Sequence, residues 1–211
     1  MNTVMNKKLY LKYITTFYQD TDKSYTTEYF EKIIYIVNKI PMNAFLTKIA
    51  LIHSPFTQEY DLSKFGLYYI DFKIEKINKK ILNNEISSTQ YKSTNFNLKT
   101  IYHQFPDLYK KDYNYNSKIL ITDFFGPEQN YIMIDGNHTY ERKKATGKPF
   151  LIYCIPYQEL NTDCFCNKIS YLLYYLHNEF WLIFQLNKDN KEMQKKLISQ
   201  SKILLETETF I

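Results

Sequence analysis

The chain is poor in cysteine, and an odd number of cysteines cannot all form disulfides within it. Its 211 residues contain three, Cys154, Cys164 and Cys166. No positively charged region followed by an apolar segment, the pattern of a secretory signal, precedes them. We therefore predict free thiols in a reducing cytoplasm. The single C-x-C motif lacks a second paired motif and has poor spacing for zinc, so no metal site is predicted.

Long hydrophobic runs and blocks of one charge are also absent. The strongly apolar stretch over residues 172–186 is interrupted by polar residues, so it is too short and too polar to span a bilayer. The net charge of +5 is spread along the chain, which permits a polyanionic partner without requiring one. A hydrophobic content of 45% is ample for a core, and either one large domain or one domain with helical additions is expected.

Glycine is scarce as well, and two of the four glycines lie within residues 131–156. This stretch combines apolar runs, a polar turn and a charged segment. Asn137 is the expected N-cap of its helix, and Gly147 is expected to end that helix in the left-handed conformation. The predicted elements are a strand over 131–134, a turn at 135–137, a helix over 138–146 and a second strand over 150–155.

The N-terminus of this helix favours an anion. The N–H groups of a first helical turn lack partners within the helix, and the helix dipole is positive there. Arg142, the only arginine in the chain, and Lys143 can reach back toward a bound anion, because helical side chains tilt toward the N-terminus. In the alternative interpretation, Asn137 only caps the helix, His138 is a partly exposed polar residue, and the basic residues form a solvated face.

The sequence Ile134-Asp135-Gly136-Asn137-His138, followed by a basic helix, a glycine and a strand, resembles the (I/V)-D-G-x-H-R turn of the ParB/sulfiredoxin-like superfamily. Residues 69–74, 98–110 and 119–123 match the first strand, the helix and the preceding strand of that family. The resemblance implies an α+β fold with a small mixed β-sheet of ParB/sulfiredoxin-like type. The expected organisation is a helical N-terminal region over 1–65 packed on the core, the core over 66–160, and C-terminal helices over 161–211.

Two positions depart from the family pattern. Reductases of the family have a cysteine directly before the histidine, and Asn137 at this position excludes their sulfur chemistry. Thr139 stands where an arginine usually follows the histidine, which removes a bidentate phosphate clamp. Either Arg142 or Lys143 compensates, or nucleotide binding is weak or lost.

The resemblance implies that the turn holds the phosphates of a nucleoside triphosphate with Mg²⁺, and that phosphoryl transfer or nucleotide hydrolysis follows. Asp135 would orient the turn or hold the divalent ion through water, while Glu141 is an alternative general base. The candidate catalytic residues are Asp135, His138 and Glu141. The candidate nucleotide-binding residues are Gly136, Asn137, His138, Thr139, Arg142 and Lys143.

Two other functions remain open from the sequence. The first is a non-catalytic accessory protein that binds DNA or a protein partner and retains a degenerate nucleotide pocket, which the threonine at position 139 supports. The second is a metal-dependent nuclease that uses Asp135 and His138, although one carboxylate and one histidine make an incomplete metal site.

The N-terminal part of the chain contains one clear helical pattern. Apolar residues recur at helical spacing after Thr26 or Thr27, either of which is a suitable N-cap, and Pro41 ends the pattern. Residues 7–20 fit a helix or a strand. The other predictions here are an apolar segment of undetermined type over 45–52 and a loop or core-edge role for His53.

The remaining segments are predicted from their polarity and spacing. Residues 83–97 are polar and lack an apolar period, so they are expected to form a surface loop that serves as a lid or simply connects. His103 falls in the following helix, where it could approach His138 or have no chemical role, and we favour the second. A helix with a broad apolar stripe is expected from Asp163, and a charged amphipathic helix over 191–205 follows a break at 187–190.

Overall fold

The computed structural model describes residues 6–42, 57–61, 65–103, 117–127 and 129–206, which form two compact units. The first unit combines segments from both ends of the chain, and the second is built from the middle. The first takes in the described residues of Met1–Pro55, Glu59–Ile70 and Lys168–Ile211, and the second those of Phe56–Gln58 and Asp71–Asn167. The segment 45–52 and His53, for which predictions were made, lie outside the described residues.

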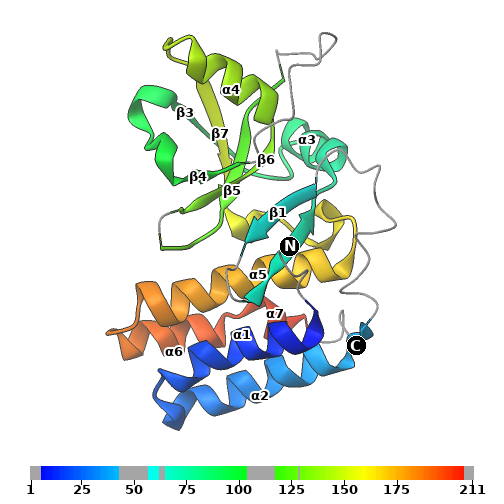
Figure 1. The fold of residues 1–211 in the computed structure, drawn as a ribbon, viewed down its shortest axis with the longest axis vertical. Helices are drawn as coiled ribbons and strands as arrows, with labels where there is room; N and C mark the ends of the chain where they lie inside the picture. Colours follow the sequence, from blue (N-terminus) through cyan, green and yellow to red (C-terminus); the bar gives the residue numbers. More distant parts are fainter. Residues whose placement is uncertain (1–5, 43–56, 62–64, 104–116, 128, 207–211) are drawn as a thin grey trace. The chain divides into compact units, whose positions relative to one another are not determined.

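The first unit is mainly helical (Figure 1). Its core helix is α5, in which every residue from 170 to 180 is buried, as expected for a helix surrounded by others. Aromatic rings from both ends of the chain meet around it, with Phe17 stacked on Phe180 at 5.2 Å and Phe30 on Phe184 at 5.1 Å between centroids. The elements are α1 (Lys7–Gln19), α2 (Lys23–Lys39), α5 (Lys168–Trp181), a π-helical turn (Leu182–Leu186), α6 (Lys191–Ser199) and α7 (Lys202–Leu205).

The start of α2 differs from the prediction. Asp22, and neither Thr26 nor Thr27, is the N-cap, because its side chain accepts a hydrogen bond from the Ser24 N–H at 3.0 Å. Thr26 lies inside the helix, where its hydroxyl donates to the Asp22 carbonyl at 2.9 Å. The ambiguous stretch over residues 7–20 is helical, as α1.

The boundaries of the C-terminal helices α5, α6 and α7 also differ from the predicted ones. Helix α5 begins at Lys168 and not at Asp163, which lies in a 3-10 turn. The helix expected over 191–205 is interrupted after α6, because Ser201 starts a new helix by accepting a hydrogen bond from the Leu204 N–H at 3.3 Å. None of the helices in the described parts of the chain has the length and apolar character needed to cross a membrane.

The second unit contains an open, mixed five-stranded sheet in the order β3-β7-β5-β6-β4. Strands β5 and β6 are antiparallel, whereas β7 is parallel to β5 and β4 is parallel to β6. This arrangement confirms the predicted combination of helices with a small mixed sheet. The strands are β3 (Thr89–Lys92), β4 (Ile101–Tyr102), β5 (Leu120–Asp123), β6 (Tyr131–Asp135) and β7 (Leu151–Ile155).

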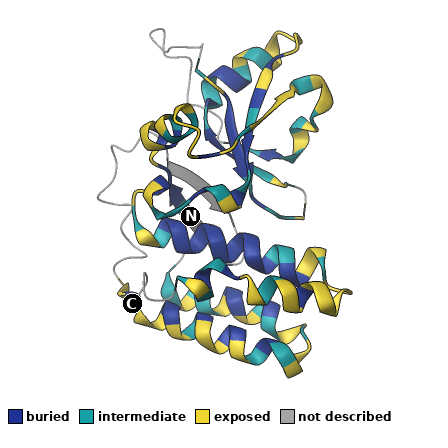
Figure 2. Ribbon diagram, turned by 180° about the vertical axis from the view of Figure 1, so that it is seen from behind, coloured by how far each residue is buried: buried dark blue, intermediate teal, exposed yellow. Residues whose placement is uncertain are grey.

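The central strands are buried on both faces (Figure 2). Helix α4 (Asn137–Ala145) joins β6 to β7, which are separated in the sheet by β5. Its Tyr140 is fully buried in a cluster with Ile121, Met133 and Ile152, so α4 packs on one face of the sheet. The prediction of a strand, a turn, a helix and a second strand over residues 131–155 is confirmed.

Three other predictions are met only in part by the described residues, and the first of them concerns a strand that lies mostly in the first unit. The strand expected over 69–74 is β2 (Leu67–Asp71), which pairs with β1 (Thr57–Asp61) in a separate two-stranded sheet, and Ile74 already starts α3 (Ile74–Leu82). Residues 98–103 form a 3-10 turn and β4 in place of the helix expected over 98–110. The loop expected over 83–97 contains β3, whose four residues are all exposed, so no apolar alternation marks it.

Candidate functional site

The turn between β6 and α4 is built around Gly136. Its φ of +94° lies in the left-handed region, and its carbonyl accepts the first helical hydrogen bond from the Tyr140 N–H at 2.7 Å. A Cβ at this position would lie 2.6 Å from the Lys118 carbonyl oxygen and 2.9 Å from the Ile119 Cα. Only glycine therefore allows the backbone before β5 to approach the turn so closely.

The prediction that Asn137 is the N-cap of this helix is wrong. Gly136 is the N-cap, and Asn137 is the first residue of α4, so its side chain does not cap the helix. Among the described residues, the buried Oδ1 of Asn137 has no hydrogen-bond partner. Buried polar atoms are nearly always paired, so this oxygen is an exception within the turn.

Asp135 closes the turn from the strand side. Its Oδ1 accepts a hydrogen bond from the Gly136 N–H at 2.7 Å. Burial raises the pKa of the Asp135 carboxyl, and the hydrogen bond from Gly136 partly opposes that rise. The side chain is half-buried, and its hydrogen bond orients the turn.

Thr139 points into the protein. It is fully buried, and its Oγ1 lies 2.6 Å from the Ser117 Oγ in a hydrogen bond between the two hydroxyls. An anion at the first turn of α4 would therefore meet the Thr139 backbone N–H and not its side chain. The Thr139 hydroxyl ties α4 to the residues before β5.

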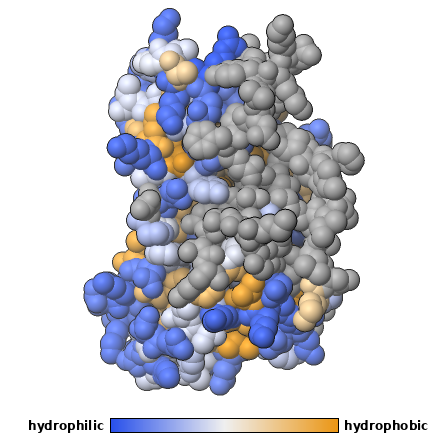
Figure 3. Space-filling model, in the orientation of Figure 1, coloured by the Kyte–Doolittle hydropathy of each residue, from blue (hydrophilic) through white to orange (hydrophobic). Residues whose placement is uncertain are grey.

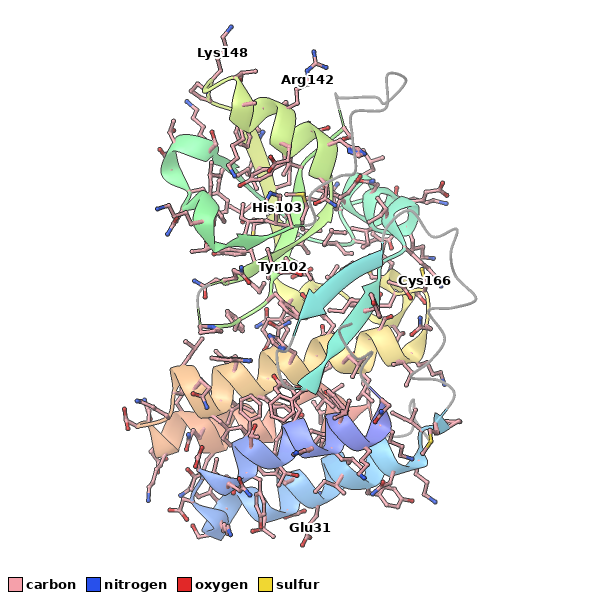
Figure 4. The ribbon with its side chains drawn as sticks, in the orientation of Figure 1. Glu31, Tyr102, His103, Arg142, Lys148 and Cys166 are labelled. Carbon is pink, nitrogen blue, oxygen red and sulfur yellow. The ribbon has the colours of Figure 1, made fainter. Side chains whose placement is uncertain are left out.

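The basic residues of α4 lie on its outer side. Arg142 is exposed, and its side chain extends away from the helix (Figure 4). Lys143 is half-buried, while Lys144 is exposed and lies 3.9 Å from the Glu141 Oε1. The described surface around this helix is predominantly hydrophilic (Figure 3). An anion at the first turn would recruit Arg142 only after its side chain changes rotamer.

Glu141 contacts His103, for which no chemical role was predicted from the sequence. The Nε2 of His103 lies 2.5 Å from the Glu141 Oε1, and the His103 side chain is 10% exposed. The imidazole also stands edge-on to the Tyr140 ring at 4.8 Å. Burial, and then the nearby Glu141 charge, raise the pKa of Tyr140 to about 12, which keeps its hydroxyl protonated. Its hydroxyl donates to the Leu98 carbonyl at 3.3 Å.

No local sequence signal could have revealed this contact. His103 follows β4, and the parallel pairing of β4 with β6 sets Tyr102 opposite Ile132. His103 is the residue after β4, and its side chain contacts Glu141 of α4. A two-residue strand has no detectable periodicity, so the contact depends on tertiary structure alone.

The cysteines contribute nothing to this turn. None of the three forms a disulfide, and Cys154 and Cys164 are buried while Cys166 is exposed. Burial, followed by the charge of Asp123, raises the pKa of the Cys154 thiol to about 12. Within the parts of the chain that the structure describes, no group of three or more His, Cys, Asp or Glu side chains is arranged to hold a metal ion.

The structure brings most of the candidate residues to one end of α4. Asp135, Gly136, Asn137 and His138 form the turn and the first helical residues, and Glu141 follows one turn later. Comparisons of the chain with protein-family models, with curated proteins and with solved structures find no match. The chemistry of the site is therefore inferred from its own side chains.

Proposed function

We propose that this chain binds the phosphates of a nucleoside triphosphate at the N-terminus of α4, and that it is a member of the ParB/sulfiredoxin-like superfamily. The observation that carries the proposal is the Gly136 turn, which starts α4 beside a tight backbone approach and leaves the first helical N–H groups for an anion. The Asn137 amide oxygen, which is unpaired among the described residues, adds an acceptor for a ribose hydroxyl.

Each residue of the turn has a part in this proposal. The backbone from Gly136 to Thr139 cradles the phosphates, and Asp135 holds the turn in shape. Mg²⁺ prefers oxygen ligands and keeps several waters, and Asp135 is the residue that would hold it through water when the nucleotide is bound. Arg142 or Lys143 supplies the positive charge that the family places directly after the histidine. The reaction proposed is phosphoryl transfer or hydrolysis of the nucleotide.

Thermal unfolding with nucleotides tests this function. Millimolar ATP, ADP, GTP and CTP, each with Mg²⁺, are compared with Mg²⁺ alone and with adenosine, which lacks phosphates. A ligand at one hundred times its Kd stabilises the native state by about 2.7 kcal/mol, so at least one nucleotide is expected to raise the melting temperature. An unchanged melting temperature with all four nucleotides would overturn the proposal.

Arg142→Ala tests whether this side chain compensates for the threonine at position 139. Loss of a charge-assisted hydrogen bond is expected to weaken nucleotide binding by about 1.5–3 kcal/mol, measured by calorimetry, without changing the fold. Lys148→Ala is the matched control, because Lys148 is an exposed cation beyond the other end of α4 (Figure 4). Equal affinity in both variants would show that Arg142 is a solvated helix residue.

A non-catalytic accessory protein is the second candidate. The burial of Thr139 and the outward direction of Arg142 favour it, because both features leave the turn without the side-chain phosphate clamp of the family. Binding to DNA or to a protein partner in the absence of any nucleotide effect would support this function. A metal-dependent nuclease is less well supported, since the described residues hold no cluster of metal ligands at Asp135 and His138.

A further inference from the structure

Glu141 lies on the same face of α4 as the first residues of the helix. Asn137 and His138 precede it by four and three positions, and residues at these spacings are neighbours on a helix surface. Four residues rise by about 6 Å, and helical side chains tilt toward the N-terminus. Helix geometry therefore places Glu141 one turn beyond the proposed phosphate site, on the side of α4 that carries Asn137 and His138.

The carboxylate is held in one orientation from a separate strand. The His103 Nε2 donates to Oε1 at 2.5 Å, and the imidazole is packed edge-on against Tyr140, which is itself anchored in the core of the second unit. The Glu141 side chain is 25% exposed, and its Oε1 also lies 3.9 Å from the Lys144 Nζ. The carboxylate is thus held through Oε1, in a side chain that is partly open to solvent.

We infer that Glu141 is the general base that activates water against the terminal phosphate at the α4 N-terminus, and that His103 is the residue that positions it. The inference rests on the proposed nucleotide site. The water oxygen forms a bond to the terminal phosphorus while its proton passes to the Glu141 Oε2. The bond from that phosphorus to the bridging oxygen breaks, and the electron pair stays on the nucleoside diphosphate. Inorganic phosphate leaves, and the Glu141 proton returns to solvent.

The proposed roles require different chemical groups at Glu141 and His103. Variants of the two residues can therefore distinguish catalysis from a purely structural contact. Glu141 must carry a charged carboxylate, because the neutral amide of Glu141→Gln accepts a proton far less readily. His103 needs only an N–H at the position of Nε2. Glutamine can place an amide N–H near that position, whereas asparagine is too short, so His103→Gln retains the positioning and His103→Asn loses it.

The experiment measures phosphate release from Mg²⁺-ATP and the other triphosphates under single-turnover conditions, with nucleotide affinity and thermal unfolding measured on each variant. Glu141→Gln is expected to lower the rate about 100-fold or more with little change in affinity. His103→Asn is expected to lower it about tenfold to 100-fold, and His103→Gln to remain within a few-fold of wild type. Glu75→Gln, at an exposed site in the first turn of α3, is the control and should match wild type.

The outcomes distinguish the two proposals. If the wild-type chain binds no nucleotide, the proposed function fails and this inference fails with it. If nucleotide binds but no phosphate is released, or if Glu141→Gln releases it at the wild-type rate, the nucleotide site stands and the inference is overturned. Equal losses in His103→Gln and His103→Asn would overturn the positioning role of His103. Changes in unfolding without changes in rate would show that the pair only joins β4 to α4.

Discussion

Replacing Gly136 with alanine is expected to destabilise the fold by about 2–5 kcal/mol. The left-handed conformation of a non-glycine residue costs about 1–2 kcal/mol. The added Cβ would also lie 2.6 Å from the Lys118 carbonyl oxygen, and moving packed backbone apart costs about 1–3 kcal/mol more. Urea denaturation of the variant measures the change.

The chain provides a matched control at the other end of α4. Gly147 also has a left-handed φ, of +64°, but a Cβ there would meet no atom within 4 Å. Gly147→Ala is therefore expected to cost only the conformational term, about 1 kcal/mol. Equal destabilisation by the two substitutions would show that the close approach to Lys118 contributes nothing.

The same pair of variants bears on nucleotide binding. Any rearrangement at Gly136 moves the first N–H groups of α4, so the alanine variant is expected to lose nucleotide binding at temperatures where it is still folded. Gly147→Ala leaves that end of the helix unchanged and should bind as the wild type does. Retained binding in a folded Gly136→Ala variant would place the phosphates elsewhere.

Replacing Glu179 with alanine is expected to destabilise the first unit by about 3–5 kcal/mol, because each buried donor left unpaired costs about 1–3 kcal/mol. The carboxylate lies inside the helical unit, 5% exposed. Its Oε2 accepts from the Tyr29 hydroxyl at 3.1 Å and the Ser201 hydroxyl at 2.7 Å, and its Oε1 accepts from the Lys202 N–H at 2.9 Å. Thermal and urea unfolding check the result, and a change below 1 kcal/mol would contradict it.

The pH dependence of stability provides a second measurement on Glu179. Burial raises its pKa above the ordinary value, although hydrogen bonds from Ser201 and Tyr29 act in the opposite direction. The folded state therefore holds the proton to higher pH than the unfolded state does. Its contribution to stability is greatest below the unfolded pKa, near 4.3, and decreases as pH rises through the folded pKa.

Glu179→Gln is the control for that measurement, because the amide has the same shape and does not titrate. The stability of the wild type relative to Glu179→Gln should decrease as pH rises from about 4 toward neutrality. A difference that stays constant over this range would show that the Glu179 pKa is the same in the folded and unfolded states.

Local sequence signals were sufficient for the elements of residues 131–155. Each of the four elements has a local sequence pattern only a few residues long. The structure contains all four: a buried strand, a turn with a glycine, a short charged helix and a second strand. Helical spacing likewise predicted the apolar stripe of α5. The positive φ of Gly136 was expected from its place in a turn, whereas the close approach of the Lys118 backbone was not.

Tertiary structure alone decided the contacts of the site. Gly136, and not Asn137, is the N-cap, in a turn that lies close to the backbone at Lys118, and Thr139 faces Ser117 because α4 lies on the sheet. The contact between Glu141 and His103 joins residues 38 positions apart. Such contacts follow from the pairing of short strands and from the face on which a helix packs. Strand pairing and helix packing both depend on partners that are distant in the sequence. They therefore produce no periodic pattern in the residues that make these contacts.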